Sequence, residues 1–509
     1  MRTLQEALGE VEAYSPAEER LNRRRRTVGL LLGPMVFLAL LWMPMAALPV
    51  PAHRLAAVVA LVCILWLTEA LPLAVTALVG PILAVLVGVA PAQAALAPFA
   101  DPLVFLLIGS FMLAEAMFVH GLDRRIAFAA LGSRIVGSSP VRLVMVYAAL
   151  GAAASLWMSN IATTAMMFPV GLSIVAYFVR TAPAGNRSVS RFALGLMLLT
   201  SFAPAVGGLA TPVGSAPNLI GISMLDRHAA VAVPFFRWFA MTLPIAITLL
   251  LFVIAYFYVT CLRGLSLPSF SADDLTREQA TIGPSTKGQR NVVIAFGVTV
   301  VLWMSPGLMT LAGEAGAAWS RTLGAVVPEG VAAMVGAILL FVLPVDWRSR
   351  RFTLTWAEAV RIDWGIILLY GGGLALGELA FATGLAEAAG RNLAAWLPSE
   401  TPLTLTLLFT AFSILVSQTT SSTVTAVMVV PTAIVVAQAA GVRPLEPALG
   451  ATLGSSMGFM MPISSASNAI VYGSGYVPIT SMIRHGLVCG LAGILVIVPC
   501  VLILGRLVF

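Results

Sequence analysis

Apolar runs of roughly 20 residues recur along almost the entire chain, and this feature limits the possible fold more than any other. A helix of that length crosses about 30 Å of hydrocarbon and satisfies its own backbone hydrogen bonds there. Soluble domains carry about 25% charged residues, whereas this chain carries 10% charged and 59% hydrophobic residues. We therefore predict an all-α polytopic membrane protein. A soluble enzyme, a nucleic-acid binder and a disulfide-stapled secreted domain are excluded.

Eleven of the runs are predicted to be transmembrane helices. They lie at about 27–48, 55–71, 73–91, 102–120, 192–223, 233–261, 291–311, 329–344, 363–384, 447–475 and 482–508. Two further apolar stretches, 140–179 and 402–438, are too long for one crossing, and Ser, Thr and Asn interrupt each near its middle. Polar breaks at membrane depth are tolerated only inside protein or beside a wet cavity. We expect both stretches to be re-entrant hairpins that mark functional sites.

The positions of the basic residues predict the orientation of the chain. With a cytoplasmic N-terminus, 22 of the 29 Lys and Arg residues fall on the inner side and 7 on the outer side, as the positive-inside rule requires. The net charge of +7 is thus interpreted as a set of orientation signals. We expect a multi-pass protein of the plasma (inner) membrane, in contact with lipid and without a nucleic-acid partner.

The two hairpins carry matching sequences. The first break reads SLWMSNIAT over 155–163 and the second reads SQTTSSTVT over 417–425, and in each a Pro follows ten residues after the central Ser. Downstream, GSAPN at 214–218 and SSASN at 464–468 interrupt two further spans. Each copy would contain five crossings and a hairpin, so the second copy would enter the membrane upside down. Inverted repeats with paired broken helices are typical of secondary transporters.

The repeat divides the chain into five parts. They are a cytoplasmic N-terminal segment at 1–26, a first transmembrane helix at 27–52, a first inverted repeat at 53–262, a cytoplasmic linker at 263–290 and a second inverted repeat at 291–509. Glu115 and Glu378 occupy matched places after Gly109 and Gly371. As carboxylates within spans they are candidates for a proton or ion path, with a packing role as the alternative.

The polar breaks can form a small binding cavity. Half-helix N-termini and hydroxyl groups favour an anionic oxygen, while unwound carbonyls and hydroxyl oxygens suit a hard cation such as Na⁺. Neither hairpin tip and neither break contains Arg, Lys or His. A multiply charged anion would therefore need neutralisation by another group, and co-bound Na⁺ is the simplest one. The sequence contains no phosphate-binding loop of the GxxxxGK[ST] type, so nothing in it indicates transport driven by ATP.

The residues of these tips and breaks resemble those of a known family, the divalent anion/sodium symporters. The resemblance rests on the doubled hairpin tips and breaks, on Gly371-Gly372-Gly373 and on the NAIVYG run at 468–473, and it extends from about 30 to 505. Members of that family carry dicarboxylates, citrate or sulfate. The resemblance implies a homodimer in which a scaffold domain holds the interface and a transport domain moves like an elevator.

The resemblance also implies two sodium sites and one substrate site. By position, the first sodium site would be formed by Ser155, Ser159, Asn160 and Gly214, and the second by Ser417, Thr420, Ser422 and Ser464. The substrate would be bound by Asn160, Ile161 and Ser215 from the first repeat and by Ser422, Thr423 and Ser465 from the second.

The sequence departs from the family pattern at three places. Ile161 stands where Thr is usual, Ser422 where Asn is usual, and Ala466-Ser467 where a pair of Pro residues is usual. One substrate donor is thereby lost and another is shortened, whereas the sodium oxygens are largely retained. The departures leave open an anion that is smaller, differently shaped or less polar than a C4-dicarboxylate.

Together these observations predict a sodium-coupled symporter that imports small dianions, with C4-dicarboxylates such as succinate first among the substrates. The alternatives are a symporter for sulfate or another oxyanion and a sodium-independent dicarboxylate exchanger. An exchanger would need a fixed positive charge near the anion, and the sequence shows none. A membrane-embedded enzyme would need a nucleophile with its base, or metal ligands, within the spans, and all four histidines fall near span ends.

Overall fold

The computed structural model describes residues 16–45, 48–133, 135–137, 139–183, 186–267, 283–310, 312–395 and 401–509. Residues 1–15 of the predicted N-terminal segment and 268–282 of the predicted linker lie outside the described residues.

The described secondary-structure elements of the first half of the chain are all helices. Its elements are α2 (Pro16–Trp42), α3 (Val50–Thr68), α4 (Leu73–Leu86), α5 (Ala92–Leu96), the 3-10 helix η1 (Ala97–Ala100), α6 (Pro102–His120), α7 (Leu122–Leu131), α8 (Pro140–Ser155), α9 (Asn160–Thr181), α10 (Arg187–Gly207), α11 (Ala216–Ala229), α12 (Phe235–Phe257) and the π-helix η2 (Tyr258–Leu262). Helix α2 starts earlier than the predicted first span at 27–52, within the charged segment, and ends at Trp42.

The second half contains one small pair of strands among its helices. Its elements are α14 (Lys287–Thr310), α15 (Gly313–Val326), α16 (Glu329–Val342), the antiparallel strands β1 (Pro344–Asp346) and β2 (Arg351–Phe352), α17 (Trp356–Ala359), α18 (Trp364–Ala382), α19 (Leu385–Ala394), α20 (Pro402–Ser417), α21 (Ser422–Ala439), α22 (Leu445–Ser455), the 3-10 helix η3 (Pro462–Ser464), α23 (Ala466–Tyr472) and α24 (Ile479–Val508).

Ten helices among the described residues are long and apolar enough to cross a membrane, or eleven if α15 and α16, which meet at 64°, form one bent span. This confirms the predicted fold class, a polytopic membrane protein made almost entirely of helices. The individual spans differ from the prediction. Helix α4 has only 14 residues, whereas α9 and α21, predicted as second arms of the hairpins, are themselves long enough to cross. Re-entry of the two hairpins therefore stays a prediction.

The order and length of the helices repeat between the two halves. Helices α6 and α18 have 19 residues each, α7 and α19 have 10 each, and α8 and α20 have 16 each. The same turn joins the first two members of each series, because Gly121 and Gly384 adopt positive φ angles of 62° and 78°, a conformation that glycine adopts without steric cost. The internal repeat is thus visible in local structure, while the inversion of one copy relative to the other stays a prediction.

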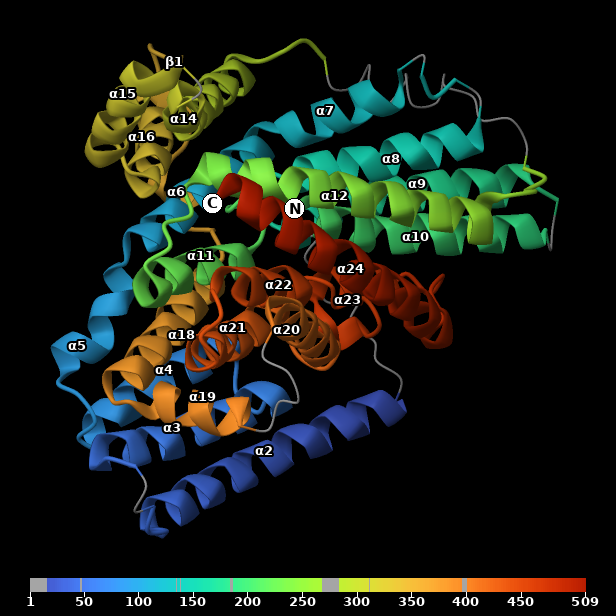
Figure 1. Ribbon diagram of the computed structural model, residues 1–509. Coiled ribbons are helices and arrows are strands. Elements are labelled where there is room, and N and C mark those ends of the chain that lie inside the picture. Colours follow the sequence, from blue (N-terminus) through green and yellow to red (C-terminus); the bar gives the residue numbers. More distant parts are fainter. Residues whose placement is uncertain are drawn as a thin grey trace.

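The hairpin helices pack with the broken helices of their own copy and of the other copy. Helix α8 packs against α10, and α20 packs against α22. Across the two copies, α23 packs against α9 and α10, and α11 packs against α21 and α22. Figure 1 shows these helices together, with α3, α4, α5 and α18 to one side and α14, α15 and α16 at one corner. Both pairs of polar breaks therefore lie in one helical body.

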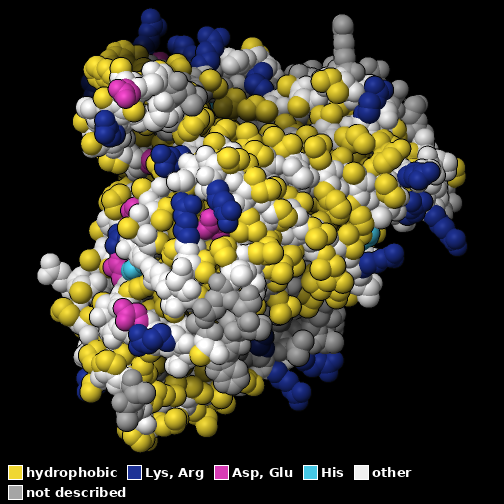
Figure 2. All heavy atoms as spheres, in the orientation of Figure 1, with side chains coloured by type: hydrophobic (Ala, Val, Ile, Leu, Met, Phe, Trp, Pro, Cys, Tyr) yellow, Lys and Arg dark blue, Asp and Glu magenta, His cyan; other side chains and the backbone are white. Residues whose placement is uncertain are grey.

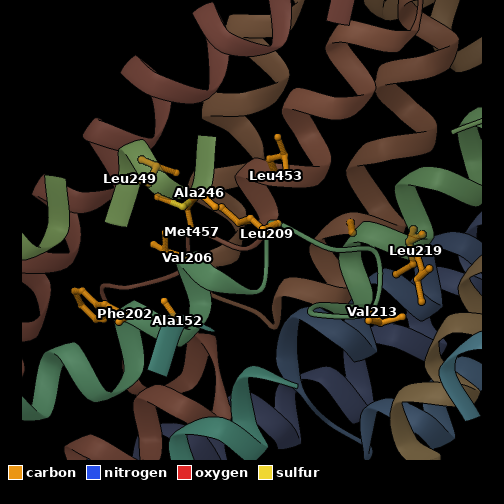
Figure 3. Close-up of a cluster of buried hydrophobic side chains, with 14 of the residues drawn as sticks. Ala152, Phe202, Val206, Leu209, Val213, Leu219, Ala246, Leu249, Leu453 and Met457 are labelled. Atoms are coloured by element: carbon orange, nitrogen blue, oxygen red, sulfur yellow. The ribbon is translucent and has the colours of Figure 1, made fainter. Parts of the chain in front are cut away.

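Buried apolar side chains hold the first break in place. Phe202 and Val206 at the end of α10 and Leu209 in the following loop are fully buried, as are Leu249 of α12 and Met457 after α22. Figure 3 shows this cluster with the loop after α10 passing between the neighbouring helices. Close packing of this kind resists small displacements, so it fixes where the polar loop atoms lie.

The outer surface is apolar over much of its area. Figure 2 shows hydrophobic side chains across the middle of one face, with most Lys and Arg side chains toward its edges. Large exposed residues such as Leu31 of α2, Leu251 of α12 and Leu495 of α24 belong to candidate spans. In a membrane these side chains contact lipid, which removes the penalty they would carry in water.

Candidate functional site

The first hairpin tip is a short turn between α8 and α9. Ser159 precedes α9, and its Oγ accepts a hydrogen bond of 3.2 Å from the backbone N–H of Ala162, as an N-capping serine does. The hydroxyl of Ser155 donates to Oδ1 of Asn160 over 2.7 Å. Three of the four predicted ligands of the first sodium site are therefore brought together at this tip.

The second tip has the same backbone. Ser421 caps α21 with φ −65° and ψ 149°, close to the −61° and 148° of Ser159, and its Oγ accepts from the N–H of Val424 over 3.3 Å. Ser417 ends α20 and is fully buried. The hydroxyl of Thr420 is buried and has no hydrogen-bond partner among the described residues. An orphaned buried hydroxyl costs free energy, so this oxygen is available to bind a ligand.

The break between α10 and α11 is closed by an asparagine. The side-chain amide of Asn218 donates to the backbone oxygens of Gly208 and Thr211, with both distances 2.8 Å. These carbonyls lie ten and seven residues upstream of the amide. The unwound loop is thus held in a tight curve by one side chain.

The break between α22 and α23 is closed in the same way. The amide of Asn468 donates to the backbone oxygens of Gly458 at 2.9 Å and Met461 at 3.1 Å, again ten and seven residues upstream. Its Oδ1 accepts a hydrogen bond of 2.5 Å from the hydroxyl of Ser201 on α10. Sequence reasoning did not select the two asparagines as site residues, although each stands three positions after a matched serine in both motifs.

The first tip and the first break meet at two glycines. A Cβ atom on Gly214 would lie 2.7 Å from the backbone oxygen of Ser155, and one on Gly208 would overlap Oδ1 of Asn160. Only glycine permits this approach. The backbone oxygens of Ser155, Gly208 and Gly214 and the amide oxygen of Asn160 therefore form one compact group, the first oxygen cradle.

The second tip and break form a corresponding group, the second oxygen cradle. A Cβ atom on Gly458 would lie 2.5 Å from the backbone oxygen of Ser417. The hydroxyl of Ser464 donates to the backbone oxygen of Gly458 over 2.7 Å. The orphaned hydroxyl of Thr420 belongs to the same tip, three residues after Ser417, and we count it with this group of uncharged oxygens.

Both cradles have the chemistry that a sodium ion requires. Their oxygens belong to carbonyls, hydroxyls and one amide, which are ligands for hard cations. Among the described residues no group of three or more His, Cys, Asp or Glu could hold a metal ion. The predicted ligands are not titratable, so cation binding in these cradles does not compete with protonation of a carboxylate.

Three predicted substrate residues stand in the first turns of the hairpin helices. Ile161 of α9 is 37% exposed, and Ser422 and Thr423 of α21 are partly exposed. The two hydroxyls make no hydrogen bond with the described residues, so they are free to donate to a ligand.

The other predicted substrate residues cap the half-helices after the breaks. Ser465 accepts from the N–H of Asn468 over 3.2 Å, which engages its hydroxyl within the protein. Ser215 makes no such capping bond, and its Oγ lies 3.4 Å from that of Ser456 in the other copy. The structure thus joins the two copies at Ser215, and it gives matched serines different partners.

Two cavities lie elsewhere, and neither is lined by a predicted site residue. One of about 1650 Å³ is bounded by the starts of α6, α12 and α16 and by α15. The other, of about 370 Å³, is apolar and lies among α3, α18, α19 and α21.

The matched carboxylates Glu115 and Glu378 have different surroundings. Glu378 forms an ion pair with Arg227 of α11, which also pairs with Asp101 before α6. The hydroxyl of Tyr370 donates to Asp101 over 3.3 Å. Glu115 forms no hydrogen bond or ion pair with the described residues. Of the two carboxylates, Glu378 alone therefore has an ion-pair partner among the described residues.

Comparison with known proteins gives matches along nearly the whole chain. Residues 24–509 match the family described as "Sodium:sulfate symporter transmembrane region". The sodium-dependent dicarboxylate transporter SdcS of Staphylococcus saprophyticus is 29% identical over 476 residues, which cover 92% of this chain and 90% of that protein. The SdcS protein of Staphylococcus aureus strain USA300 is 27% identical, with coverage of 92% and 89%.

Two solved transporter structures share the fold. The YdaH transporter of Alcanivorax borkumensis superposes with a TM-score of 0.55 at 15% sequence identity, over 81% of this chain and 87% of that chain. MtrF of Neisseria gonorrhoeae superposes with a TM-score of 0.50 at 12% identity, over 80% and 82% of the two chains. At these identities the likeness concerns the fold alone.

Proposed function

The chain belongs to the sodium:sulfate symporter family, the divalent anion/sodium symporters, and on this premise we propose that it imports small dianions, above all C4-dicarboxylates such as succinate, together with Na⁺. Membership makes the chain a membrane transporter rather than an enzyme, and the predicted resemblance to this family is confirmed. The SdcS relatives, named as sodium-dependent dicarboxylate transporters, support sodium as the coupling ion.

The observation that carries the proposal is the pair of oxygen cradles without a fixed positive charge. The carbonyl oxygens carry partial negative charge, and no charged group of the cradles offsets the two carboxylates of the substrate, whose charge is costly to bring into a medium of low dielectric constant. A cation in each cradle supplies the missing charge, so substrate affinity depends on bound sodium. We place the first ion at Ser155, Ser159, Asn160 and Gly214, and the second at Ser417, Thr420, Ser422 and Ser464.

The substrate is assigned to the space between the two tips. Its carboxylates contact Asn160 and Ser215 from the first copy and Ser422, Thr423 and Ser465 from the second, while Ile161 packs against its carbon skeleton. The free hydroxyls of Ser422 and Thr423 support this assignment. The hydroxyl of Ser465 accepts the capping bond of α23 and can still donate its own proton to a carboxylate.

Uptake into proteoliposomes tests the transport function. Labelled succinate, citrate and sulfate are supplied with an inward Na⁺ gradient or with choline at constant pH. We expect succinate uptake only with sodium. Full uptake in choline would overturn the proposal, and dependence on an internal anion would then indicate the exchanger. Greater uptake of sulfate than of succinate would indicate the oxyanion symporter.

We further propose that α8–α12 and α20–α24 move as one transport domain against a dimeric scaffold, in a membrane protein whose N-terminus is cytoplasmic. The packing of both breaks in one helical body supports this division. Single cysteines at Ile161 and Thr423 are labelled with a membrane-impermeant reagent from each side. We expect the side of the membrane from which these cysteines are labelled to change when Na⁺ and succinate are varied. Labelling that does not depend on either ligand would contradict an elevator movement.

A further inference from the structure

Gln418 follows the last residue of α20 and is almost completely buried, with 5% of its surface exposed. Its Nε2 donates to the backbone oxygens of Ile414 at 2.7 Å and Met457 at 3.1 Å. Its Oε1 accepts from the backbone N–H of Met460 over 2.8 Å. One side chain therefore joins the hairpin to the loop that breaks the second span.

The loop partners of Gln418 lie on either side of Gly458. The backbone oxygen of Gly458 accepts from Ser464 and Asn468 and belongs to the second oxygen cradle. An amide suits this pair of bonds, because its nitrogen donates and its oxygen accepts at separate atoms, whereas an ionised carboxylate cannot donate. The side chain thus holds the loop on both sides of Gly458 against the end of α20, where Ser417 lies.

The first cradle is joined by other means. The matched position in the first hairpin is Leu156, whose backbone oxygen accepts from the hydroxyl of Thr211. That hydroxyl also accepts from the N–H of Gly214 over 3.0 Å. The side chain that joins tip and break therefore belongs to the hairpin in the second copy, where it is Gln418, and to the loop in the first copy, where it is Thr211. Two unrelated side chains perform the same task, which indicates that the spacing of tip and break matters in both copies.

We propose that Gln418 is a positioning residue of the second sodium site. It touches neither ion nor substrate, and it sets the separation between the oxygens of Ser417 and Gly458 so that a cation can bind both and also reach Thr420. This inference rests on the proposed sodium-coupled function. Its consequence is that the amide tunes which monovalent cation fits the second cradle.

The test uses Gln418→Met, which keeps the length and the unbranched shape but loses every hydrogen bond. Sodium-driven succinate uptake and sodium-dependent thermal stabilisation of the purified full-length protein are both measured. We expect the half-saturating Na⁺ concentration to rise about tenfold, since several bonds of ordinary strength are lost. The half-saturating succinate concentration at saturating Na⁺ should stay within about twofold.

A change in cation preference separates positioning from general damage. The ratio of half-saturating Li⁺ to Na⁺ is expected to change in Gln418→Met, because a displaced carbonyl alters the size of the cradle. Loss of folded carriers alone would lower the maximal rate equally for both cations and leave this ratio unchanged. That outcome would overturn the inference.

The matched control is Gln289→Leu. Gln289 is equally buried, with 4% exposed, and its amide donates to the backbone oxygen of His120 over 3.0 Å, in a region that contains neither cradle. Its sodium dependence should equal that of the unchanged protein. If Gln418→Met does not fold, Gln418→Asn, which is shorter by one methylene and cannot reach both loop atoms, provides the same measurement.

The two proposals fail in different ways. If the unchanged protein transports without sodium, the proposed function is wrong. If the unchanged protein requires sodium and neither Gln418 variant alters the sodium concentration or the cation ratio, only the role of Gln418 is wrong.

Discussion

The two oxygen cradles have almost the same backbone and different side chains. In each, a serine caps the hairpin helix and an asparagine clamps carbonyls ten and seven residues upstream. The first cradle adds the amide oxygen of Asn160, whereas the second adds the buried hydroxyl of Thr420. The two copies thus share a loop framework and differ in the side-chain oxygens that it carries. Two cation sites of different affinity are the expected result.

The two clamping side chains, Asn218 (the first clamp) and Asn468 (the second clamp), also differ in how firmly they are held. Oδ1 of Asn468 accepts from Ser201 of the other copy, whereas Oδ1 of Asn218 is buried without a partner among the described residues. The second clamp is therefore tied to the first copy, and the first clamp has no equivalent tie. Loss of the second clamp should disturb both copies.

The largest effect is expected from removing that clamp. Asn468→Leu takes one of two side-chain donors, Asn468 and Ser464, from the backbone oxygens of Gly458 and Met461, and it leaves the hydroxyl of Ser201 without its acceptor. We expect uptake to fall about a hundredfold or more, equivalent to about 2.8 kcal/mol, and Asn218→Leu to cause a smaller loss of about tenfold. Rates are normalised to folded carrier measured by size-exclusion chromatography. Equal losses of uptake in the two variants would show that the hydrogen bond from Ser201 to Asn468 does not contribute to transport.

Removing one oxygen from the second cradle should have a narrower effect. Thr420→Val keeps the shape, and the lost hydroxyl has no protein partner, so the thermal stability of the sodium-free protein should not fall. The half-saturating Na⁺ concentration should rise about tenfold, as for loss of one ligand worth about 1.4 kcal/mol. Asn160→Ala provides the comparison in the first cradle. Its sodium-free protein should lose stability as well, because the bond from Ser155 is broken. An unchanged sodium dependence in Thr420→Val would remove Thr420 from the site.

The tips differ from the usual family pattern at one position each, and these positions test substrate selection. Ile161 cannot donate a hydrogen bond, and Ser422 is shorter than asparagine. Ile161→Thr combined with Ser422→Asn is expected to shift preference toward succinate-like dicarboxylates by about tenfold, or 1.4 kcal/mol. Competition by succinate, citrate and sulfate is measured in the single and double variants. An unchanged rank order would mean that neither position touches the substrate.

Much of this arrangement could be predicted from local sequence. The breaks at 155–163 and 417–425 coincide with the ends of α8 and α20. The Ser, Thr and Asn residues there interrupt long apolar runs, and a serine can cap the next helix. Helices α7, α15 and α19 were not predicted, since their mixed apolar and charged residues match neither a span nor a loop.

The contacts that hold the cradles together could not be predicted in the same way. The Gln418 amide bonds to a loop about 40 residues away, and Ser201 meets Asn468 from 267 positions upstream. Periodicity reports which face of a helix is apolar, and it carries no information about which distant loop a polar side chain reaches. The repeat supplied the only sequence signal, because both asparagines stand at the same place after a break.

The smallest effect is expected at the matched carboxylates, where the two copies differ most plainly in charge pairing. Glu378→Gln removes one of the two carboxylates that face Arg227, which still retains Asp101. The pair is partly exposed, so the loss should be about 1 kcal/mol or less, seen as a slightly lower melting temperature with unchanged sodium dependence. Glu115→Gln breaks no ion pair or hydrogen bond among the described residues and should leave the melting temperature unchanged. If Glu115→Gln instead alters the pH dependence of uptake, this carboxylate is part of a proton path, and the two copies differ in chemistry as well as in packing.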